Sequence, residues 1–277
     1  MRPETILTST RELFKKHLPP GWNGPNTTVT ASRKIVEQGI ILPDAKNLLR
    51  AVSVSADSGK RSPSEKLWCF RREPYISEHK TADPKHAEKR LEKAVVNEET
   101  GLGSDWGNQI STASGLSKNR GDSRRNIDLV RMLAEDRYRF IELKVKRGTN
   151  TPLSAGIELL EYALLHVWVR QHLGELISDR TIPDCDASAS LLKARVIELE
   201  VLAPDDYYFG YNEDGMRRLQ AELERICVAL GAQAGMKMQF RYKTLAKFDL
   251  KTMPDHPNRE WLALRFEAPA DRYLPFP

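Results

Sequence analysis

Two apolar-rich segments joined by a four-residue polar turn constrain the fold of this chain most strongly. Residues 126–133 and 138–145 alternate apolar and polar side chains on either side of the turn at 134–137, which predicts a β-hairpin. The residues at 148–152, GTNTP, end the second strand, and a largely apolar helix over 153–173 follows. Because these elements need apolar cover, we expect a mixed α/β or α+β core flanked by additional elements.

Patterns on either side of the hairpin predict the remaining elements. Asp83 and Pro84 are an N-cap acid and a proline at the first helical position, so we expect a helix from there to about residue 97. The other expected elements are an amphipathic start at 6–18, a helical patch at 35–49 interrupted at Pro43, a polar loop at 53–66, strands at 67–70, 105–111 and 192–201, a helix at 214–230 and a last strand or hairpin at 236–248. We divide the chain into an N-terminal accessory region and linker at 1–66, a core at 67–202 and a C-terminal helix–strand extension packed on that core at 203–277.

Composition places the chain among globular proteins. It has 277 residues, of which 40% are hydrophobic and 29% charged, enough to bury a sizeable core. The longest apolar stretch without charge, Tyr162 to Val169, is far shorter than the roughly 20 residues of a membrane-spanning helix, so we expect no membrane partner. The N-terminus does not resemble a secretory signal, and the 3 cysteines are widely spaced and form no metal-binding pair. These features predict a cytoplasmic protein.

The positive charge of the chain is concentrated in one window. The formal net charge is +5, and ten of the 43 basic residues but only five of the 38 acidic ones lie between Lys118 and Arg147. The rest of the chain is therefore neutral overall. We expect one group of these cations, near the two strands, to neutralise the phosphates of a nucleic acid: Lys118, Arg120, Arg124, Arg125, Lys146 and Arg147. Three others near the hairpin turn, Arg131, Arg137 and Arg139, are interpreted as solvated surface charges.

Acidic and basic side chains within the hairpin predict a metal site. Glu142 and Lys144 share one face of the second strand because side chains alternate along a strand. If Asp128 on the first strand projects to that face, the two carboxylates and the carbonyl of Leu143 can bind a divalent cation. Such a cation polarises a phosphoryl oxygen and acidifies a bound water, while Lys144 orients that water or stabilises developing charge.

The length of the hairpin turn decides whether this site can form. With a four-residue turn, Asp128 would oppose Leu143 and point away from Glu142. A loop of a different length, a bend or a β-bulge would instead bring Asp128 to the face of Glu142. The metal-site hypothesis therefore predicts such an irregularity.

The order of these elements resembles that of the PD-(D/E)xK, or restriction-endonuclease-like, nuclease superfamily over residues 84–201. The resemblance implies a central mixed sheet flanked by helices, with an acid on the first helix at Glu88 or, as the second choice, Glu92. Glu158 and Tyr162 are spaced like the Gln-xxx-Tyr of the RecB-like branch. The chain departs from the family pattern at Ile127, where a proline precedes the Asp in the motif, and at Glu158, where that branch has glutamine.

These observations lead to one main hypothesis and two alternatives. We expect a Mg²⁺-dependent deoxyribonuclease, with Mn²⁺ as a possible substitute, an endonuclease rather than an exonuclease, acting in restriction, repair or phage defence. Its catalytic residues would be Glu88, Asp128, Glu142 and Lys144. The first alternative is a non-catalytic module that keeps the nuclease fold and binds nucleic acid or a protein. The second is an unrelated α/β protein, in which Asp128 and Glu142 lie far apart. Whether the chain forms a homodimer or a larger assembly is left open by the sequence.

Overall fold

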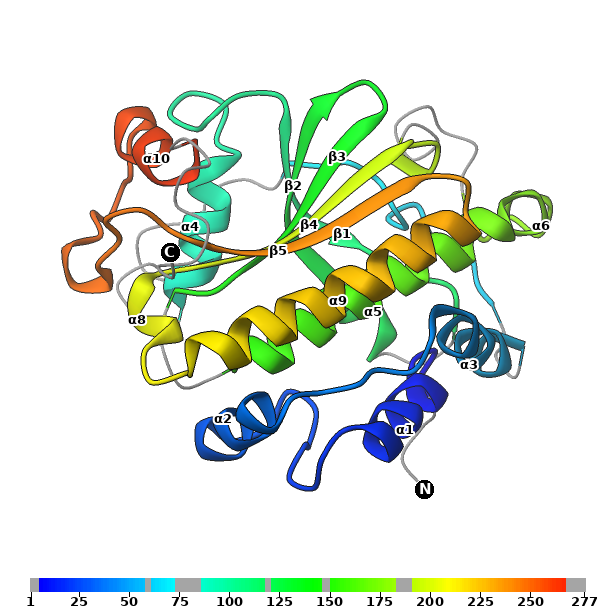
Figure 1. Cartoon of the computed structure of the whole chain (residues 1–277). Coiled ribbons are helices and arrows are strands. Elements are labelled where there is room, and N and C mark those ends of the chain that lie inside the picture. Colours follow the sequence, from blue (N-terminus) through cyan, green and yellow to red (C-terminus); the bar gives the residue numbers. More distant parts are fainter. Residues whose placement is uncertain are drawn as a thin grey trace.

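A five-stranded mixed sheet forms the centre of the molecule, and helices flank both of its faces (Figure 1). The computed structural model describes residues 5–57, 61–72, 86–117, 121–145, 150–182 and 191–267. The strands are β1 (Trp106–Ser111), β2 (Asn126–Ala134), β3 (Arg137–Leu143), β4 (Val196–Ala203) and β5 (Lys237–Thr244). They follow one another across the sheet in chain order. The β1–β2 and β2–β3 pairs are antiparallel, whereas β3–β4 and β4–β5 are parallel.

The helices differ in length and in how deeply they are buried. They are α1 (Thr8–His17), α2 (Val29–Gln38), α3 (Ala45–Asp57), α4 (Ala87–Val95), α5 (Pro152–Gln171), α6 (Leu173–Ser178), α8 (Asp205–Tyr208), α9 (Glu213–Gln233) and α10 (Arg259–Phe266), with short 3₁₀ turns η3 (Asp122–Arg124) and η4 (Leu250–Thr252). The expected α+β class and the mixed sheet flanked by helices are confirmed.

Helix α5 is the central helix of the molecule. Thr151 caps it by accepting a hydrogen bond from the amide of Ser154, and Pro152 begins it, one residue before the expected start at 153, because a proline fits the first helical position. Nearly all of its residues are buried, which agrees with its largely apolar composition. Gly156 allows a close approach to the sheet, because a Cβ there would lie 2.4 Å from the hydroxyl of Tyr242 on β5.

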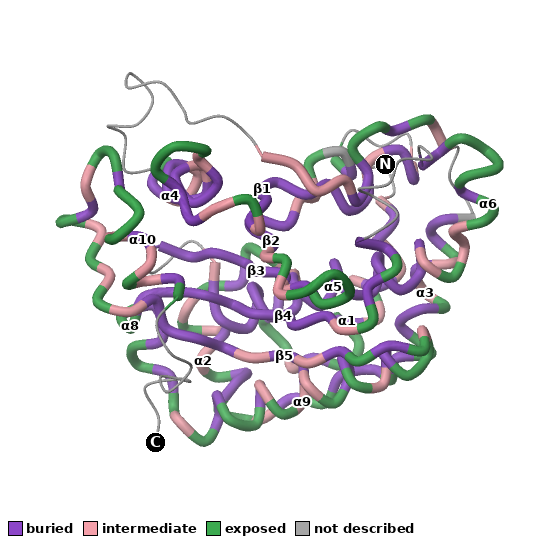
Figure 2. The backbone as a smooth tube through the Cα atoms, turned by 90° about the horizontal axis from the view of Figure 1, so that it is seen from above, coloured by how far each residue is buried: buried purple, intermediate pink, exposed green. Residues whose placement is uncertain are grey.

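The two faces of the sheet carry separate apolar clusters. Phe140 and Leu199 pack on the face covered by α5 and α9. Ile141, Leu143 and Leu202 pack on the opposite face with residues of α4 and α10. Figure 2 shows the resulting run of buried residues along β3 and β4. The strand alternation expected for Glu142 and Lys144 on one side and Ile141 and Leu143 on the other is confirmed.

The N-terminal region packs into the same core as the sheet. Ile6, Leu7 and Phe14 are almost fully buried and belong to the apolar cluster under α5. Figure 1 shows α1, α2 and α3 on the far side of α5 and α9 from the sheet. The polar loop expected at 53–66 is wrong for its first residues, which continue α3 to Asp57 because the buried Val52 and Ala56 keep the helical spacing.

Several element boundaries also differ from the expected ones. The strand expected at 67–70 is only an isolated bridge at Leu67, and the expected strand at 192–201 begins later, at Val196, and continues to Ala203. The last element, expected as a strand or a hairpin, is a single strand, β5, and it completes the sheet beside β4. The expected start of the helix at Asp83 and Pro84 lies outside the described residues.

Candidate functional site

The β2–β3 hairpin brings Asp128 and Glu142 to the same face of the sheet. Leu129 pairs with Ile141, so the preceding residue on β2, Asp128, opposes Glu142 on β3. The register shifts after Met132, next to the turn, in a β-bulge or irregularity. The irregularity that the metal-site hypothesis required is therefore present, and Asp128 and Glu142 do not lie far apart.

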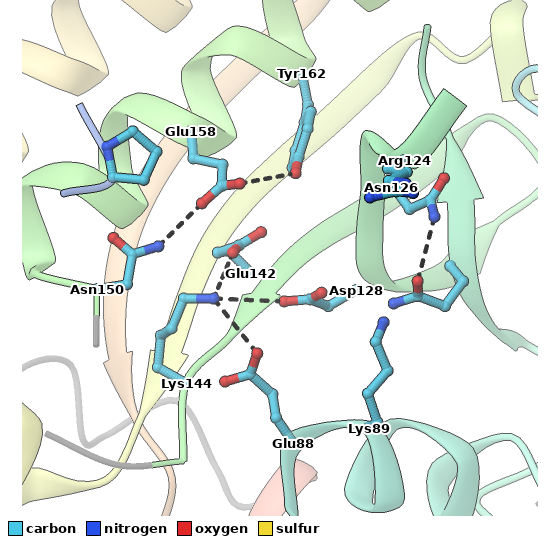
Figure 3. Close-up of a pocket in the computed structure, with 12 residues that line it drawn as sticks. Glu88, Lys89, Arg124, Asn126, Asp128, Glu142, Lys144, Asn150, Glu158 and Tyr162 are labelled. Atoms are coloured by element: carbon cyan, nitrogen blue, oxygen red, sulfur yellow. Dashed lines mark hydrogen bonds and ion pairs between the residues drawn. The ribbon is translucent and has the colours of Figure 1, made fainter. Parts of the chain in front are cut away.

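Lys144 lies at the centre of a group of carboxylates (Figure 3). Its Nζ donates to Glu142 Oε1 at 2.5 Å and lies 3.7 Å from Glu88 Oε1 and 3.8 Å from Asp128 Oδ2. The amide of Leu143 donates to Asp128 Oδ2 at 3.0 Å, which holds this carboxylate against the end of β3. All four expected catalytic residues thus meet at one place.

Helix α4 contributes two acids to this group rather than one. Ligand oxygens of Glu88, Glu92 and Asp128 all lie within 4.8 Å of one another. Glu92 is completely buried, and its Oε2 accepts a hydrogen bond from Gln109 Nε2 at 2.6 Å and faces Lys89 Nζ at 3.4 Å. Glu88 and Glu92 were expected as alternatives, but the structure brings both to the site, because residues four apart share a helix face.

Four polar residues near the acids were missed by the sequence reasoning: Lys89, Gln109, Asn126 and Asn150. Gln109 has a φ of 50° inside β1, a strained conformation for a residue with a side chain, and it lies beside the acids of α4. Asn126 donates to its side-chain oxygen at 3.2 Å, and Asn150 donates to Glu158 at 3.0 Å. The only available signal was polar residues in or next to apolar strands, which is too common to identify a site.

A cavity of about 330 Å³ opens over these side chains. Its walls come from elements far apart in the chain: Glu88 and Lys89 on α4, Gln109 on β1, Arg124 in η3, Asn126 and Asp128 on β2, Glu142 and Lys144 at the end of β3, Asn150, Glu158 and Tyr162 at and on α5, and Pro25 from the N-terminal region. The two residues expected to support the site, Glu158 and Tyr162, therefore both line it. The Tyr162 hydroxyl donates to Glu158 Oε1 at 3.3 Å.

Burial and mutual repulsion raise the pKa values of Glu88, Glu92 and Glu142, the acids grouped around Asp128 and Lys144. Burial is the main cause for Glu142 and Glu92, and the charge of Asp128 raises both pKa values further. Burial also raises the pKa of Glu88, to about 7, against the opposing effect of Lys144. The acids are thus more numerous than the cations that would stabilise them.

The pKa values of the lysine and the tyrosine in the cavity are also raised. Burial alone would lower the pKa of Lys144, but the carboxylates of Glu142, Asp128 and Glu88 raise it well above its usual value, so the ammonium stays charged. Burial and the charge of Glu158 raise the pKa of Tyr162, so its hydroxyl remains protonated. Lys144 is therefore a fixed positive charge among several acids, and its chemistry is electrostatic rather than that of a base.

The donor set of the cavity fits a divalent cation. Glu92 Oε1 and Glu142 Oε2 are buried side-chain oxygens without a hydrogen-bond partner among the described residues. Burying a carboxylate oxygen without a partner is costly, and a hard cation with oxygen ligands removes that cost. A ligand oxygen of Asp128 lies within 4.8 Å of one of Glu92, and Asp128 opposes Glu142 across the hairpin.

The expected phosphate-binding residues divide into three groups. Arg124 lines the cavity and is exposed. Arg125 points away from it, because its Nε bonds to Asp122 Oδ1 at 3.0 Å and its Nη1 lies 3.6 Å from Glu161 Oε2. The other four, Lys118, Arg120, Lys146 and Arg147, lie outside the described residues.

The arginines near the hairpin turn all pair with acids, in contrast to the interpretation as unpaired surface charges, although Arg137 remains exposed. Arg139 bonds to Glu198 Oε2 at 2.7 Å, and Arg137 bonds to the other oxygen of that acid, with its Nε at 2.8 Å. Arg131 pairs with Asp105 and stacks on the ring of Trp106. Parallel pairing of β3 with β4 causes this difference, because it brings acids from a distant part of the chain beside the arginines.

Comparison with protein-family models, with curated proteins and with solved structures finds no match to this chain. Among the described residues, no helix combines the length and the apolar character needed to cross a membrane. The functional interpretation therefore depends on the site itself.

Proposed function

We propose that the protein is a metal-dependent nuclease that hydrolyses phosphodiester bonds and has a core of the PD-(D/E)xK type. Its expected substrate is DNA. The observation that carries the proposal is the convergence of Asp128, Glu142 and Lys144 beside a buried, unpartnered carboxylate oxygen of Glu142. A structural ion pair would satisfy its own oxygens. This group instead has surplus acidic oxygens facing a cavity.

The residues would divide the work as follows. Asp128, Glu142 and the carbonyl of Leu143 would hold Mg²⁺ or Mn²⁺, with Glu88 and Glu92 supplying further oxygens from α4. A cation bound there would supply Lewis-acid activation of the phosphate and of a water molecule. Lys144 would orient the attacking water and stabilise the charge that develops on the phosphoryl oxygens. Arg124 and Lys89, on two walls of the cavity, would contact the flanking phosphates.

A cleavage assay on a panel of substrates tests this function. Wild type would be incubated with single-stranded, double-stranded and branched DNA and with RNA, each with Mg²⁺, with Mn²⁺ and with a chelator. We expect cleavage of DNA only with metal, and a loss of at least about a thousandfold in Lys144→Ala and Glu142→Gln. Arg217→Ala, which removes an exposed cation that pairs with acids on α9, serves as the control and should retain full activity.

Each result of this assay has a distinct meaning. Cleavage that persists in Lys144→Ala would refute the assignment of the site. Metal-independent binding of nucleic acid without cleavage of any substrate would identify a non-catalytic binding module instead.

A further inference from the structure

Four charged side chains in series, together with the backbone of residues 6–11, form a ring beside two walls of the cavity. Arg11 donates from Nε and Nη2 to the two oxygens of Glu161, each at 2.7 Å. Arg125 bridges the two acids of the ring, with Nε 3.0 Å from Asp122 Oδ1 and Nη1 3.6 Å from Glu161 Oε2. Asp122 Oδ2 accepts a hydrogen bond from the amide of Ile6 at 3.1 Å. Residues 6 and 11 of the N-terminal region thus close the ring from both ends.

The ring is electrically balanced, and its two acids are almost completely buried. The side chains of Asp122 and Glu161 are 0% and 2% exposed, and those of Arg125 and Arg11 are 13% and 30% exposed. Charges this deep are stable only when geometry and hydrogen bonding are well matched, and removing one leaves the others uncompensated. The bidentate contact of Arg11 with Glu161 also fixes orientation, which a single ion pair does not.

Each acid of the ring is next to residues that line the cavity. Asp122 begins the turn η3 that ends at Arg124, and Arg125 follows it directly, so ring residues hold the backbone on both sides of Arg124. Glu161 lies on α5 between Glu158 and Tyr162, which form the opposite wall. The ring therefore connects the wall that carries Arg124 to the wall that carries Glu158 and Tyr162.

The N-terminal region also contributes directly to the cavity. Pro25 lines it, and the carbonyl of the adjacent Gly24 accepts a hydrogen bond from Ser154 Oγ on α5 at 3.0 Å. Residues 6 to 25 are thus held against α5 at two separate places. An accessory region that only added stability would have no need to reach the cavity.

We propose that the N-terminal region is a positioning element of the nuclease site, in which Arg11, through Glu161, Arg125 and Asp122, sets the position of Arg124 for substrate phosphates. Arg11 touches neither substrate nor cation in this arrangement and acts only through the ring. The inference rests on the proposed function for its effect on substrate, but the mechanical connection between α1 and the two walls does not depend on it.

Arg11→Met tests both parts, because it keeps an unbranched apolar side chain and removes the guanidinium and its charge. Hydrogen exchange measures the connection: we expect faster exchange of the amides at 121–126 and in the first half of α5. Arg61→Met is the matched control, since Arg61 bonds to Glu175 at 2.6 Å and to Asp179 at 3.1 Å, in an ion-pair group whose residues do not line the cavity. It should leave exchange at 121–126 unchanged. Arg11→Lys is a milder variant if Arg11→Met folds poorly.

Steady-state cleavage measures the effect on substrate. We expect Arg11→Met to raise KM about tenfold with kcat within about twofold of wild type, because phosphate binding rather than chemistry is disturbed. In an Arg124→Gln background the same substitution should have no further effect on KM. Unchanged exchange at 121–126, or an equal KM effect in the Arg124→Gln background, would overturn the inference. If wild type cleaves nothing while the exchange results hold, the proposed function fails and the connection of α1 to the cavity walls stands.

Discussion

Two groups of buried charges lie on opposite faces of the same sheet, and they differ in whether their acids are satisfied. On one face, Arg137, Arg139 and Arg241 surround Glu198, and both oxygens of that acid accept hydrogen bonds. On the other face, the acids around Lys144 include two buried oxygens without a partner among the described residues. A group whose acidic oxygens are all hydrogen-bonded serves structure, whereas one with surplus acidic oxygens is suited to bind a cation.

The pKa values of the two groups express the same difference. Although burial opposes it, hydrogen bonds from Arg139 and Arg137 hold the pKa of Glu198 below its usual value. Burial and the charge of Asp128 raise the pKa of Glu142 despite its contact with Lys144. The fold thus stabilises the ionised form of Glu198 and destabilises the ionised form of Glu142, which is the condition that a bound divalent cation would relieve.

The largest expected difference between the group around Lys144 and the group around Glu198 is in metal affinity. Asp128→Asn should weaken Mn²⁺ binding by about a thousandfold, because a central carboxylate ligand becomes a neutral amide. Glu198→Gln should leave Mn²⁺ affinity unchanged. Isothermal titration calorimetry on the metal-free protein measures both. Equal affinities in Asp128→Asn and wild type would show that the acids around Lys144 do not hold the ion.

The same two groups should respond in opposite directions when an acid is neutralised without metal. Glu198→Gln should lower the free energy of unfolding by about 3 kcal/mol, because it leaves buried arginines without a full partner. Glu142→Gln should raise that free energy by about 1 kcal/mol, since it removes a carboxylate that the fold destabilises. Urea unfolding at pH 7 in the presence of a chelator gives both values. A loss of stability in Glu142→Gln would contradict the comparison.

The pH dependence of stability should also have opposite signs. Glu198 has a lowered pKa, so its contribution is present above pH 4.5 and is lost as the pH falls below that value. Glu142 has a raised pKa, so its contribution is present below pH 4.5 and is lost as the pH rises above it. Thermal unfolding of the metal-free protein measures both effects. Glu142→Gln should reduce the loss of stability that occurs as the pH rises towards neutral. Glu198→Gln should reduce the loss of stability that occurs as the pH falls into the acid range. The reverse assignment of the two variants would refute the stated pKa directions.

The smallest expected effect on stability is within the group of arginines around Glu198. The Arg137 side chain is 49% exposed, against 15% for Arg139. Arg137→Gln should therefore lower the free energy of unfolding by less than about 1 kcal/mol, as for other exposed ion pairs. Arg139→Gln should cost more, because its partners are buried. Urea unfolding of the two variants side by side tests the ranking, and equal costs would mean that burial does not govern this group.

Local pattern was sufficient for several elements near the site. The apolar run after residue 152 predicted α5 to within one residue of its start, and alternation along 138–145 correctly separated Glu142 from Ile141. These predictions succeeded because apolar composition and strand alternation depend on residues within a few positions of one another. The face of Asp128 was left open for a related reason: it depends on a bulge, and bulges carry little sequence signal.

Partners from distant parts of the chain could not be predicted. Arg125 was expected at the substrate, but Asp122 and Glu161 hold it in the ring with Arg11. Gln109 reaches Glu92 from a strained position on β1 that composition does not indicate. Both outcomes depend on which helix packs beside which strand.

The sequence by itself determined the hairpin, the helix that follows it, and the presence of Asp128, Glu142 and Lys144 on two adjacent strands. Tertiary structure decided that α4 brings two acids to them and that the N-terminal region reaches the cavity. It also decided that Arg124 lines the cavity, Arg125 joins the ring, and Arg137 and Arg139 pair with Glu198. The physical reason is the distance along the chain over which each interaction acts. Alternation and capping act over a few residues, whereas the pairing of buried charges requires partners that only the packed fold brings within a few ångströms.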